Sequence, residues 1–236
     1  MQVMTATEIR KRLRVLASAE EAKVLQWFFK TGPGEYGEGD VFIGVRVPAL
    51  RQLVRECPTA GEPAAKSLLQ SRVHEDRLLA LLLLVRQFAN GDGPTRERTY
   101  RLYLDCTDRI NNWDLVDLSA PNIVGEWLLE RDRRPLARLA KSKSLWERRI
   151  AIVATSAFIR RRQFDDTLRI ADLLLHDSHD LIHKATGWML REVGKRDEAV
   201  LESYLAPRCK TLPRTMLRYA IERFAEPKRQ LYLRGL

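Results

Sequence analysis

The sequence has few cysteines, and their spacing excludes two classes of site. Cys57, Cys106 and Cys209 are the three cysteines among 236 residues, and they lie far apart. An odd number of distant cysteines provides neither a disulfide framework nor a CxxC metal or redox motif. We therefore expect each of them to be a small buried apolar residue.

Long apolar runs and targeting segments are also missing. The longest apolar run, "LLALLLLV" at residues 78–85, is too short to span a bilayer and is closed by Arg86. The N-terminus alternates charged and apolar residues at helical spacing and has no signal-peptide core. Hydrophobic residues make up 45% of the chain without any low-complexity tract. These features predict a folded cytoplasmic protein with no membrane association.

The charge balance is strongly basic. The chain contains 41 Lys and Arg against 31 Asp and Glu, which gives a formal net charge of +10. Such an excess favours a polyanionic partner. Solubility or a generally basic proteome is the alternative explanation.

Helical periodicity recurs along the chain, whereas strand-like runs bounded by turns are absent. Ser18 and Glu21 have the spacing of a capping box, and Pro48 suits the first turn of another helix. The segment from Thr31 to Gly44 has five glycines and one proline in fourteen residues, which predicts a loop. This loop either contacts a polyanion or closes the N-terminal repeat, and its acidic residues favour the second role.

A basic residue placed at the start of an apolar helix recurs four times. Arg77, Arg149, Lys184 and Arg214 are separated by 72, 35 and 30 residues. A period of about 30 to 40 residues, with a helix pair in each unit, is typical of HEAT-like arrays. We therefore expect residues 1–236 to form a single all-α domain, a helical-repeat solenoid with an extended concave face.

The stretch "NNWDLVDLSAP" at residues 111–121 fills the doubled first interval. On a helix Trp113, Val116, Asp117 and Ala120 share one face, so a carboxylate lies beside an indole among apolar groups. Two interpretations remain open. Asp117 pairs with an arginine between repeats and Trp113 belongs to the core, or the two side chains stabilise a developing positive charge.

Two more tryptophans occupy related positions in later repeats. Trp146 lies three residues before Arg149, and Trp188 lies one turn after Lys184. Core packing explains any one of them, since tryptophan is mostly buried. Together they would line one side of the solenoid.

Rival sites find little support. His179 and His183 have i,i+4 spacing but no HExxH glutamate and no cysteine nearby, so we expect no metal site. The glycines of residues 32–44 lack the GK[ST] of a phosphate loop, and no GxSxG nucleophile motif is present.

Five ordered motifs carry a resemblance to a known family. They are "GEYGEGDVFIGVRVP", "NNWDLVD", "SLWERRIAI", "KATGWMLREVGK" and "PRTMLRYAIERF". Together they resemble the AlkD family of bacterial DNA alkylation repair glycosylases, which are built from HEAT-like repeats. The resemblance runs from about the first capping box to residue 225.

The resemblance implies roles for individual residues. Trp113 matches the family's sugar-facing tryptophan, and Asp117 matches its catalytic aspartate. Arg149 matches the arginine near the lesion backbone, with Arg148 as the alternative, and Trp188 matches a second wall of the groove.

It also implies a function. We expect a monomeric, monofunctional glycosylase that excises cationic alkylated purines, N7-alkylguanine and N3-alkyladenine, from double-stranded DNA without a cofactor or a base-binding pocket. Arg77, Arg148 and Lys184 would add phosphate contacts. Two alternatives remain: a lyase that uses Lys184 as an amine nucleophile, and a non-catalytic HEAT-repeat scaffold that binds DNA or protein.

Overall fold

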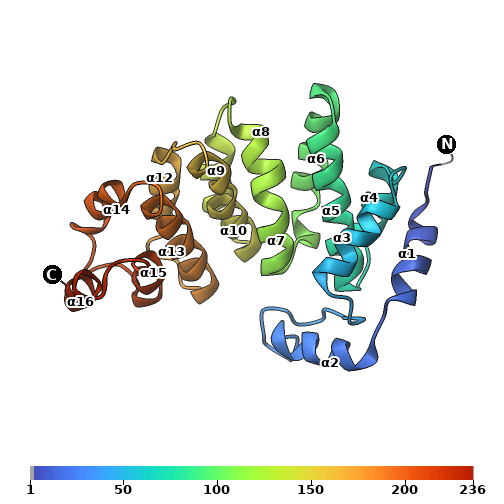
Figure 1. The fold of residues 1–236 in the computed structure, drawn as a ribbon, viewed down its shortest axis with the longest axis horizontal. Coiled ribbons are helices and arrows are strands. Elements are labelled where there is room, and N and C mark those ends of the chain that lie inside the picture. The colour runs from blue at the N-terminus through green and yellow to red at the C-terminus, as the bar shows by residue number, and fades with distance from the viewer. Residues whose placement is uncertain (1–2, 236) are drawn as a thin grey trace. The chain divides into compact units, whose positions relative to one another are not determined.

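The computed structural model describes residues 3–235, and their regular structure is helical (Figure 1). Within this range the only β pairing is an isolated bridge between Val41 and Val73. No helix of the described residues has the length and apolar character needed to cross a membrane. The prediction of an all-α fold is confirmed.

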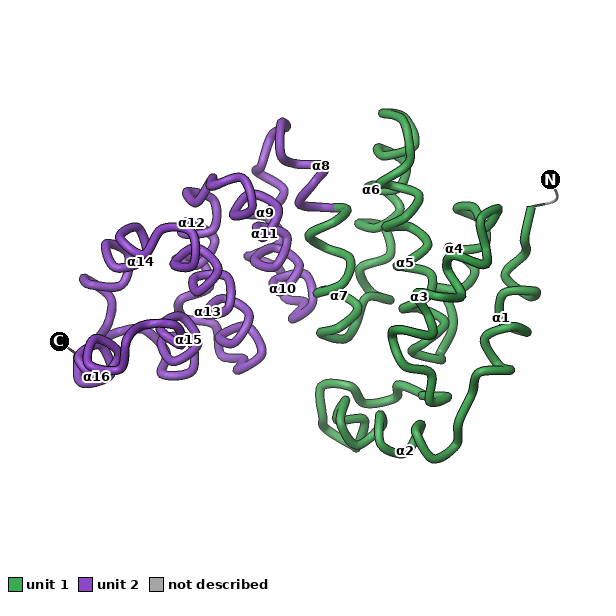
Figure 2. Tube along the Cα trace, in the orientation of Figure 1, with its two compact units in different colours: residues 1–123 green, residues 124–236 purple. Residues whose placement is uncertain are grey.

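The chain divides into two compact units, Met1–Ile123 and Val124–Leu236 (Figure 2). They are called the N-terminal unit and the C-terminal unit below. The expectation of a single domain over residues 1–236 stays a prediction, as does the concave face.

The N-terminal unit is built around one long central helix, α5. Its helices are α1 (Ala6–Val15), α2 (Ala19–Phe28), α3 (Val47–Glu56), α4 (Glu62–Leu69), α5 (His74–Asn90), α6 (Gly93–Asp105) and α7 (Trp113–Ala120). α5 packs against α3, α4, α6 and α7. Because neighbours surround it, α5 is apolar around most of its circumference, and Leu79, Leu81 and Leu84 are fully buried.

The C-terminal unit consists of repeated helix pairs. Its helices are α8 (Glu126–Leu128), α9 (Arg134–Ala140), α10 (Leu145–Ala154), α11 (Ser156–Ile159), α12 (Asp165–Leu173), α13 (Asp180–Gly194), α14 (Glu198–Leu205), α15 (Arg214–Ala220) and α16 (Glu226–Arg234). α9 packs against α10 and α12 packs against α13, while α13 also packs against α10 and α15. α13 approaches α15 closely at Gly187, where a Cβ would lie 2.4 Å from the carbonyl oxygen of Met216. The pairs α9–α10 and α12–α13 agree with the helix pairs predicted from the sequence.

The helices that carry Arg77, Arg149 and Lys184 begin slightly earlier than the sequence pattern indicated. Arg77, Arg149 and Lys184 lie inside the first or second turn of their helices instead of ahead of them. Ser144 caps α10 and His179 caps α13 through their side chains, and these caps set the starts.

The capping box predicted at Ser18 is half right. The Ser18 hydroxyl accepts from the backbone N–H of Glu21, as expected. The Ser18 N–H, however, donates to the carbonyl of Ile43, and the Glu21 carboxylate pairs with Arg46 at 2.7 Å. Contacts with the loop therefore replace the reciprocal bond of the box.

Other local expectations hold. Pro48 lies in the first turn of α3, and residues 31–44 contain no helix. Cys57, Cys106 and Cys209 are all buried and unbridged. Pro121 begins a π-helical turn, Pro121–Gly125, that follows α7 directly.

Candidate functional site

Both residues predicted to be catalytic lie on α7. α7 begins at Trp113, whose N–H donates to the side-chain oxygen of Asn112 at 2.8 Å. Asp117 follows one turn later. Val116 and Ala120 are fully buried, whereas Trp113 and Asp117 are only partly buried. The helix therefore inserts its small apolar groups into the core and leaves the indole and the carboxylate accessible.

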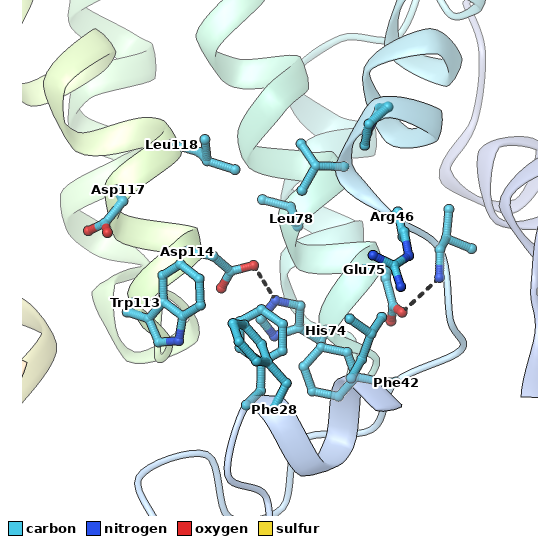
Figure 3. Close-up of a pocket in the computed structure, with 15 residues that line it drawn as sticks. Phe28, Phe42, Arg46, His74, Glu75, Leu78, Trp113, Asp114, Asp117 and Leu118 are labelled. Atoms are coloured by element: carbon cyan, nitrogen blue, oxygen red, sulfur yellow. Dashed lines mark hydrogen bonds and ion pairs between the residues drawn. The ribbon is translucent and has the colours of Figure 1, made fainter. Parts of the chain in front are cut away.

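Trp113 and Asp117 line an apolar cavity of about 470 Å³ in the N-terminal unit (Figure 3). Its walls come from α2, the segment that follows α2, the first turns of α5, and α7. The apolar side chains that line it include Leu25, Phe28, Phe29, Phe42, Leu78 and Trp113. In Figure 3 the Asp114 carboxylate points toward His74, whereas that of Asp117 points away from it.

A row of stacked rings supports the indole of Trp113. Its ring stacks on Phe29 with centroids 5.0 Å apart, and Phe29 stacks on Phe42 at 4.9 Å. Phe42 in turn stacks on the imidazole of His74 at 4.4 Å. The edge of Phe28 meets Trp113 at 5.9 Å. Such ring pairs prefer defined geometries, so the row fixes the plane of the indole.

His74 forms the centre of a buried ionic network below the cavity. Its Nδ1 lies 3.1 Å from Asp40 and its Nε2 lies 2.8 Å from Asp114. Burial alone would lower the pKa of His74, but the charge of Asp114 and hydrogen bonds to both carboxylates raise the pKa to about 9. At neutral pH the ring is an imidazolium, and each nitrogen donates to one carboxylate.

Asp40 joins three segments of the N-terminal unit. Burial would raise its pKa, but hydrogen bonding to His74 and the charge of Arg77 outweigh burial and hold the pKa of Asp40 below its ordinary value. Its carboxylate also accepts from Asn112 at 3.3 Å. The loop that contains Asp40 is thus attached to both α5 and α7.

The first turn of α5 carries two further buried acids. Glu75 accepts from the backbone N–H of Ile43, Gly44 and Val45 at 2.9 to 3.2 Å. The Asp76 carboxylate accepts hydrogen bonds from the two terminal nitrogens of the Arg14 guanidinium, at 3.0 and 2.8 Å. Glu75 therefore anchors the end of the loop, at residues 43–45, to α5, and Asp76 anchors α1.

Sequence reasoning missed this network. The available signal was "HEDR" at residues 74–77, four consecutive polar residues immediately before the longest apolar run. Charged residues at the edge of such a run are candidates for buried pairs, but the partners Asp40 and Asp114 lie 34 and 40 residues away.

Arg77 is buried and paired inside the N-terminal unit. Its side chain is 4% exposed, and it donates to Asp40 at 2.6 Å and to the carbonyl of Ser71 at 3.1 Å. The same carboxylate that binds His74 draws this arginine inward. Arg77 therefore belongs to the internal network, and its role in DNA binding stays a prediction.

Two predicted DNA-binding arginines lie on α10 of the C-terminal unit. Arg149 is buried and donates to the carbonyl of Leu181 at 2.8 Å. Arg148 is half-buried and binds Asp177 at 2.6 Å. Their assignment to the lesion backbone, and the choice between them, stay predictions.

The other two candidates lie one turn apart on α13. Lys184 is about 2.8 Å from Asp180 in a half-exposed i,i+4 pair. Trp188 is partly exposed. The spacing puts both side chains on one face of the helix, as predicted.

The histidine pair considered as a metal site has other functions. His179 caps α13 by accepting from the N–H of Leu181, and His183 bonds to the carbonyl of Asp177 at 2.6 Å. Among residues 3–235 no group of three or more His, Cys, Asp or Glu side chains is placed to hold a metal ion.

The sequence matches the model of one protein family. That family, described as "DNA alkylation repair enzyme", matches residues 9–224. The chain belongs to this family. No curated protein matches the sequence. The DNA alkylation repair family thus accounts for nearly the whole chain, including both units.

A solved structure is similar in fold to this member of the DNA alkylation repair family. It is a predicted DNA alkylation repair enzyme from Enterococcus faecalis, with a TM-score of 0.68 and 17% sequence identity. The match covers 89% of this chain and 97% of that chain. At this identity the similarity shows the fold alone, and it agrees with the helical-repeat prediction.

Proposed function

We propose that this protein is a monofunctional DNA glycosylase that hydrolyses the N-glycosidic bond of cationic alkylated purines, N7-alkylguanine and N3-alkyladenine, in duplex DNA. The observation that carries the proposal is the placement of Asp117 beside Trp113 at an accessible cavity in a member of the DNA alkylation repair family. Of the three carboxylates that line this cavity, Asp114 and Glu75 are buried and bound within the internal network, whereas Asp117 is partly exposed.

The proposed reaction uses the charge that the lesion already carries. The bond between C1′ and the purine nitrogen breaks, and its electron pair passes to the base, which leaves as a neutral molecule. Positive charge develops on the deoxyribose, where the Asp117 carboxylate and the face of the Trp113 indole stabilise it. Water then bonds to C1′ and gives its proton to Asp117 and on to solvent. No general acid is required.

The lining of the cavity supports a reaction that does not read the base. Enzymes that turn a base into a pocket recognise its edge through hydrogen bonds. Here the walls are mainly aromatic and aliphatic, and a nucleobase buried among them would leave its polar edge unpaired at a cost of about 1–3 kcal/mol per group. This argues that the enzyme recognises the sugar and the glycosidic bond to the cationic base, and not the edge of the base.

Binding to the DNA backbone is assigned to the C-terminal unit in this proposal. Arg149, with Arg148 as the alternative, would contact phosphate near the lesion, and Lys184 and Trp188 would contact the strand from one face of α13. The resemblance of "SLWERRIAI" and "KATGWMLREVGK" to the family motifs supports this assignment. Phosphate contacts of this kind position the protein without reading sequence.

The test is release of free base from a duplex that carries a single N7-methylguanine. We expect the protein to release N7-methylguanine and to leave an intact strand with an abasic site. Asp117→Asn should lose about 100-fold or more of the single-turnover rate, as removal of a group that stabilises developing charge does, and should still bind the duplex. Asp105→Asn, an exposed aspartate on α6, is the matched control and should behave as the parent.

Two results would contradict the proposal. Binding without release by the parent protein would favour the non-catalytic scaffold. Strand cleavage at the abasic site, lost in Lys184→Gln, would favour a lyase.

A further inference from the structure

We propose that His74 is a positioning residue for the proposed active site. Held between Asp40 and Asp114, it fixes the first turn of α7 and thereby the orientation of Trp113 and Asp117. This inference rests on the proposed function. The arrangement of His74 between Asp40 and Asp114, called the clamp below, is a geometric observation that does not depend on that function.

The first link between His74 and α7 is polar. Asp114 directly follows Trp113 in the chain, and its Oδ2 lies 2.8 Å from Nε2 of His74. The second carboxylate, Asp40, lies 3.1 Å from Nδ1 of His74 and also accepts from the side chain of Asn112, the cap of α7. The two nitrogens of one ring therefore hold residues on both sides of Trp113.

The second link is through the stacked rings. The imidazole is in face contact with Phe42, and Phe42 and Phe29 continue the row to the indole of Trp113. Phe29 also packs directly against His74 at 5.1 Å. A shift of the imidazole would thus displace Trp113 in two ways: the polar contacts would move its backbone, and the stacked rings would move its indole.

The arrangement needs an N–H donor for each of two carboxylates and a positive charge between them. The His74 side chain is 1% exposed, and Asp40 and Asp114 are 4% and 7% exposed, so two carboxylates face each other across a buried ring. The imidazolium provides an N–H to each of them and one positive charge. Arg77 neutralises the second negative charge through Asp40, while Glu75 turns away to the loop backbone. An uncompensated buried charge is strongly destabilising, so loss of this proton would loosen α7.

The sign of the pH dependence follows from the protonated state. The pKa of His74 is raised from 6.5 to about 9, so the clamp is intact at neutral pH and is lost as the pH rises through about 9. The groups that face the ring are Asp40 from the loop, which also binds Arg77, and Asp114 from α7. Alkaline loss of the clamp is therefore assigned to His74.

The first experiment measures base release between pH 6 and 10 under saturating protein, with protein-free duplex as the blank at each pH. We expect the single-turnover rate of the parent to fall with a midpoint near pH 9. The single-turnover rate of His74→Gln should be about 10- to 100-fold lower at pH 7, because misplacing a reacting group by about an ångström has an effect of this size. The rate of this variant should not show the fall near pH 9. Its affinity for the duplex should stay within about twofold, because the His74 side chain is only 1% exposed.

The second experiment does not depend on activity. In protein labelled with 5-fluorotryptophan, the fluorine resonance of Trp113 is identified by its absence in Trp113→Phe. We expect this resonance to shift with a midpoint near pH 9 in the parent and to stay constant in His74→Gln. The resonance of Trp127 in the C-terminal unit is the internal control. Asp114→Asn keeps a hydrogen-bond acceptor but removes the negative charge, so it should move the midpoint of the Trp113 resonance to lower pH. This variant replaces His74→Gln in the test if His74→Gln does not fold.

The outcomes separate the two proposals. A Trp113 resonance that does not titrate, with an unchanged pH profile in His74→Gln, would overturn the clamp and leave the glycosylase proposal standing. A parent that releases no base would overturn the glycosylase proposal, and the fluorine titration would still decide whether His74 positions Trp113.

Discussion

At the scale of single residues, Trp113 combines two functions that a substitution can separate. Its indole is an accessible wall of the cavity and also the end of the stacked row that begins at His74. We expect Trp113→Ala to slow base release by about tenfold or more, since a cation–π contact is worth about 1–2 kcal/mol when desolvated. Binding of the duplex should weaken much less, because the contact is strongest when positive charge develops on the sugar.

Trp113→Phe is the matched control for this prediction. It keeps a ring that can stack on Phe29, so it should retain most of the stability and a larger part of the rate. Single-turnover release and duplex affinity are measured on both variants. Equal losses of rate and affinity in Trp113→Ala would make this residue a packing or docking residue.

At the scale of elements, the wall formed by α2 depends on a close approach at Gly44. Gly44 has φ +83°, and a Cβ there would lie 2.1 Å from the carbonyl oxygen of Ser18 and 2.7 Å from the backbone nitrogen of Ala22. No flexible side chain can yield, because both contacts are backbone. We expect Gly44→Ala to displace α2 from the loop, to lower the melting temperature and to slow base release.

Gly34 offers a control with the same backbone conformation. Its φ is +74°, but a Cβ would meet nothing within 4 Å. Gly34→Ala should therefore cost only the conformational penalty of about 1 kcal/mol, and Gly44→Ala should cost several times more. Urea denaturation of both variants measures the difference. Similar losses of stability would contradict a tight backbone contact at Gly44.

The helix pairs could be predicted from the sequence because their signals are local. Apolar periodicity and caps act within a few residues. The periodicity of "DDTLRIADLLLH" and "DEAVLESYLAPRC" alone is enough to predict helices, and the structure places α12 and α14 there. The same local signals put Trp113 and Asp117 one turn apart on a helix. The family resemblance, rather than the spacing, assigned chemistry to them.

The network around His74 could not be predicted in this way. Its partners come from a glycine-rich loop, from α5 and from α7, and pairing between them depends on how these segments fold together. Arg77 illustrates the consequence. Its place at the start of an apolar helix matched that of Lys184, which is half-exposed, but Asp40, 37 residues earlier, holds Arg77 in the interior.

At the scale of the whole molecule, the positive charge is distributed unevenly. Residues 1–123 contain 17 Lys and Arg against 16 Asp and Glu, whereas residues 124–236 contain 24 against 15. The N-terminal unit, which carries the cavity, is therefore close to neutral, and the C-terminal unit carries nearly all of the net charge. Since release of counterions from phosphates drives non-specific DNA binding, we expect the C-terminal unit to provide most of the affinity.

This asymmetry predicts how affinity responds to salt in two matched variants. Lys184→Gln removes a half-exposed charge from α13, and Lys66→Gln removes an exposed charge from α4 of the N-terminal unit. If Lys184 binds one phosphate, its loss should reduce the slope of log affinity against log salt by about 0.9, whereas Lys66→Gln should leave the slope unchanged. The pair of Lys184 with Asp180 does not prevent this, because half-exposed helix pairs contribute only about 0.3–0.5 kcal/mol. Fluorescence anisotropy titrations between 50 and about 200 mM salt give both slopes. Equal slopes for the two variants would remove Lys184 from the DNA-binding surface, and a reduced slope in Lys66→Gln alone would shift that surface to the N-terminal unit.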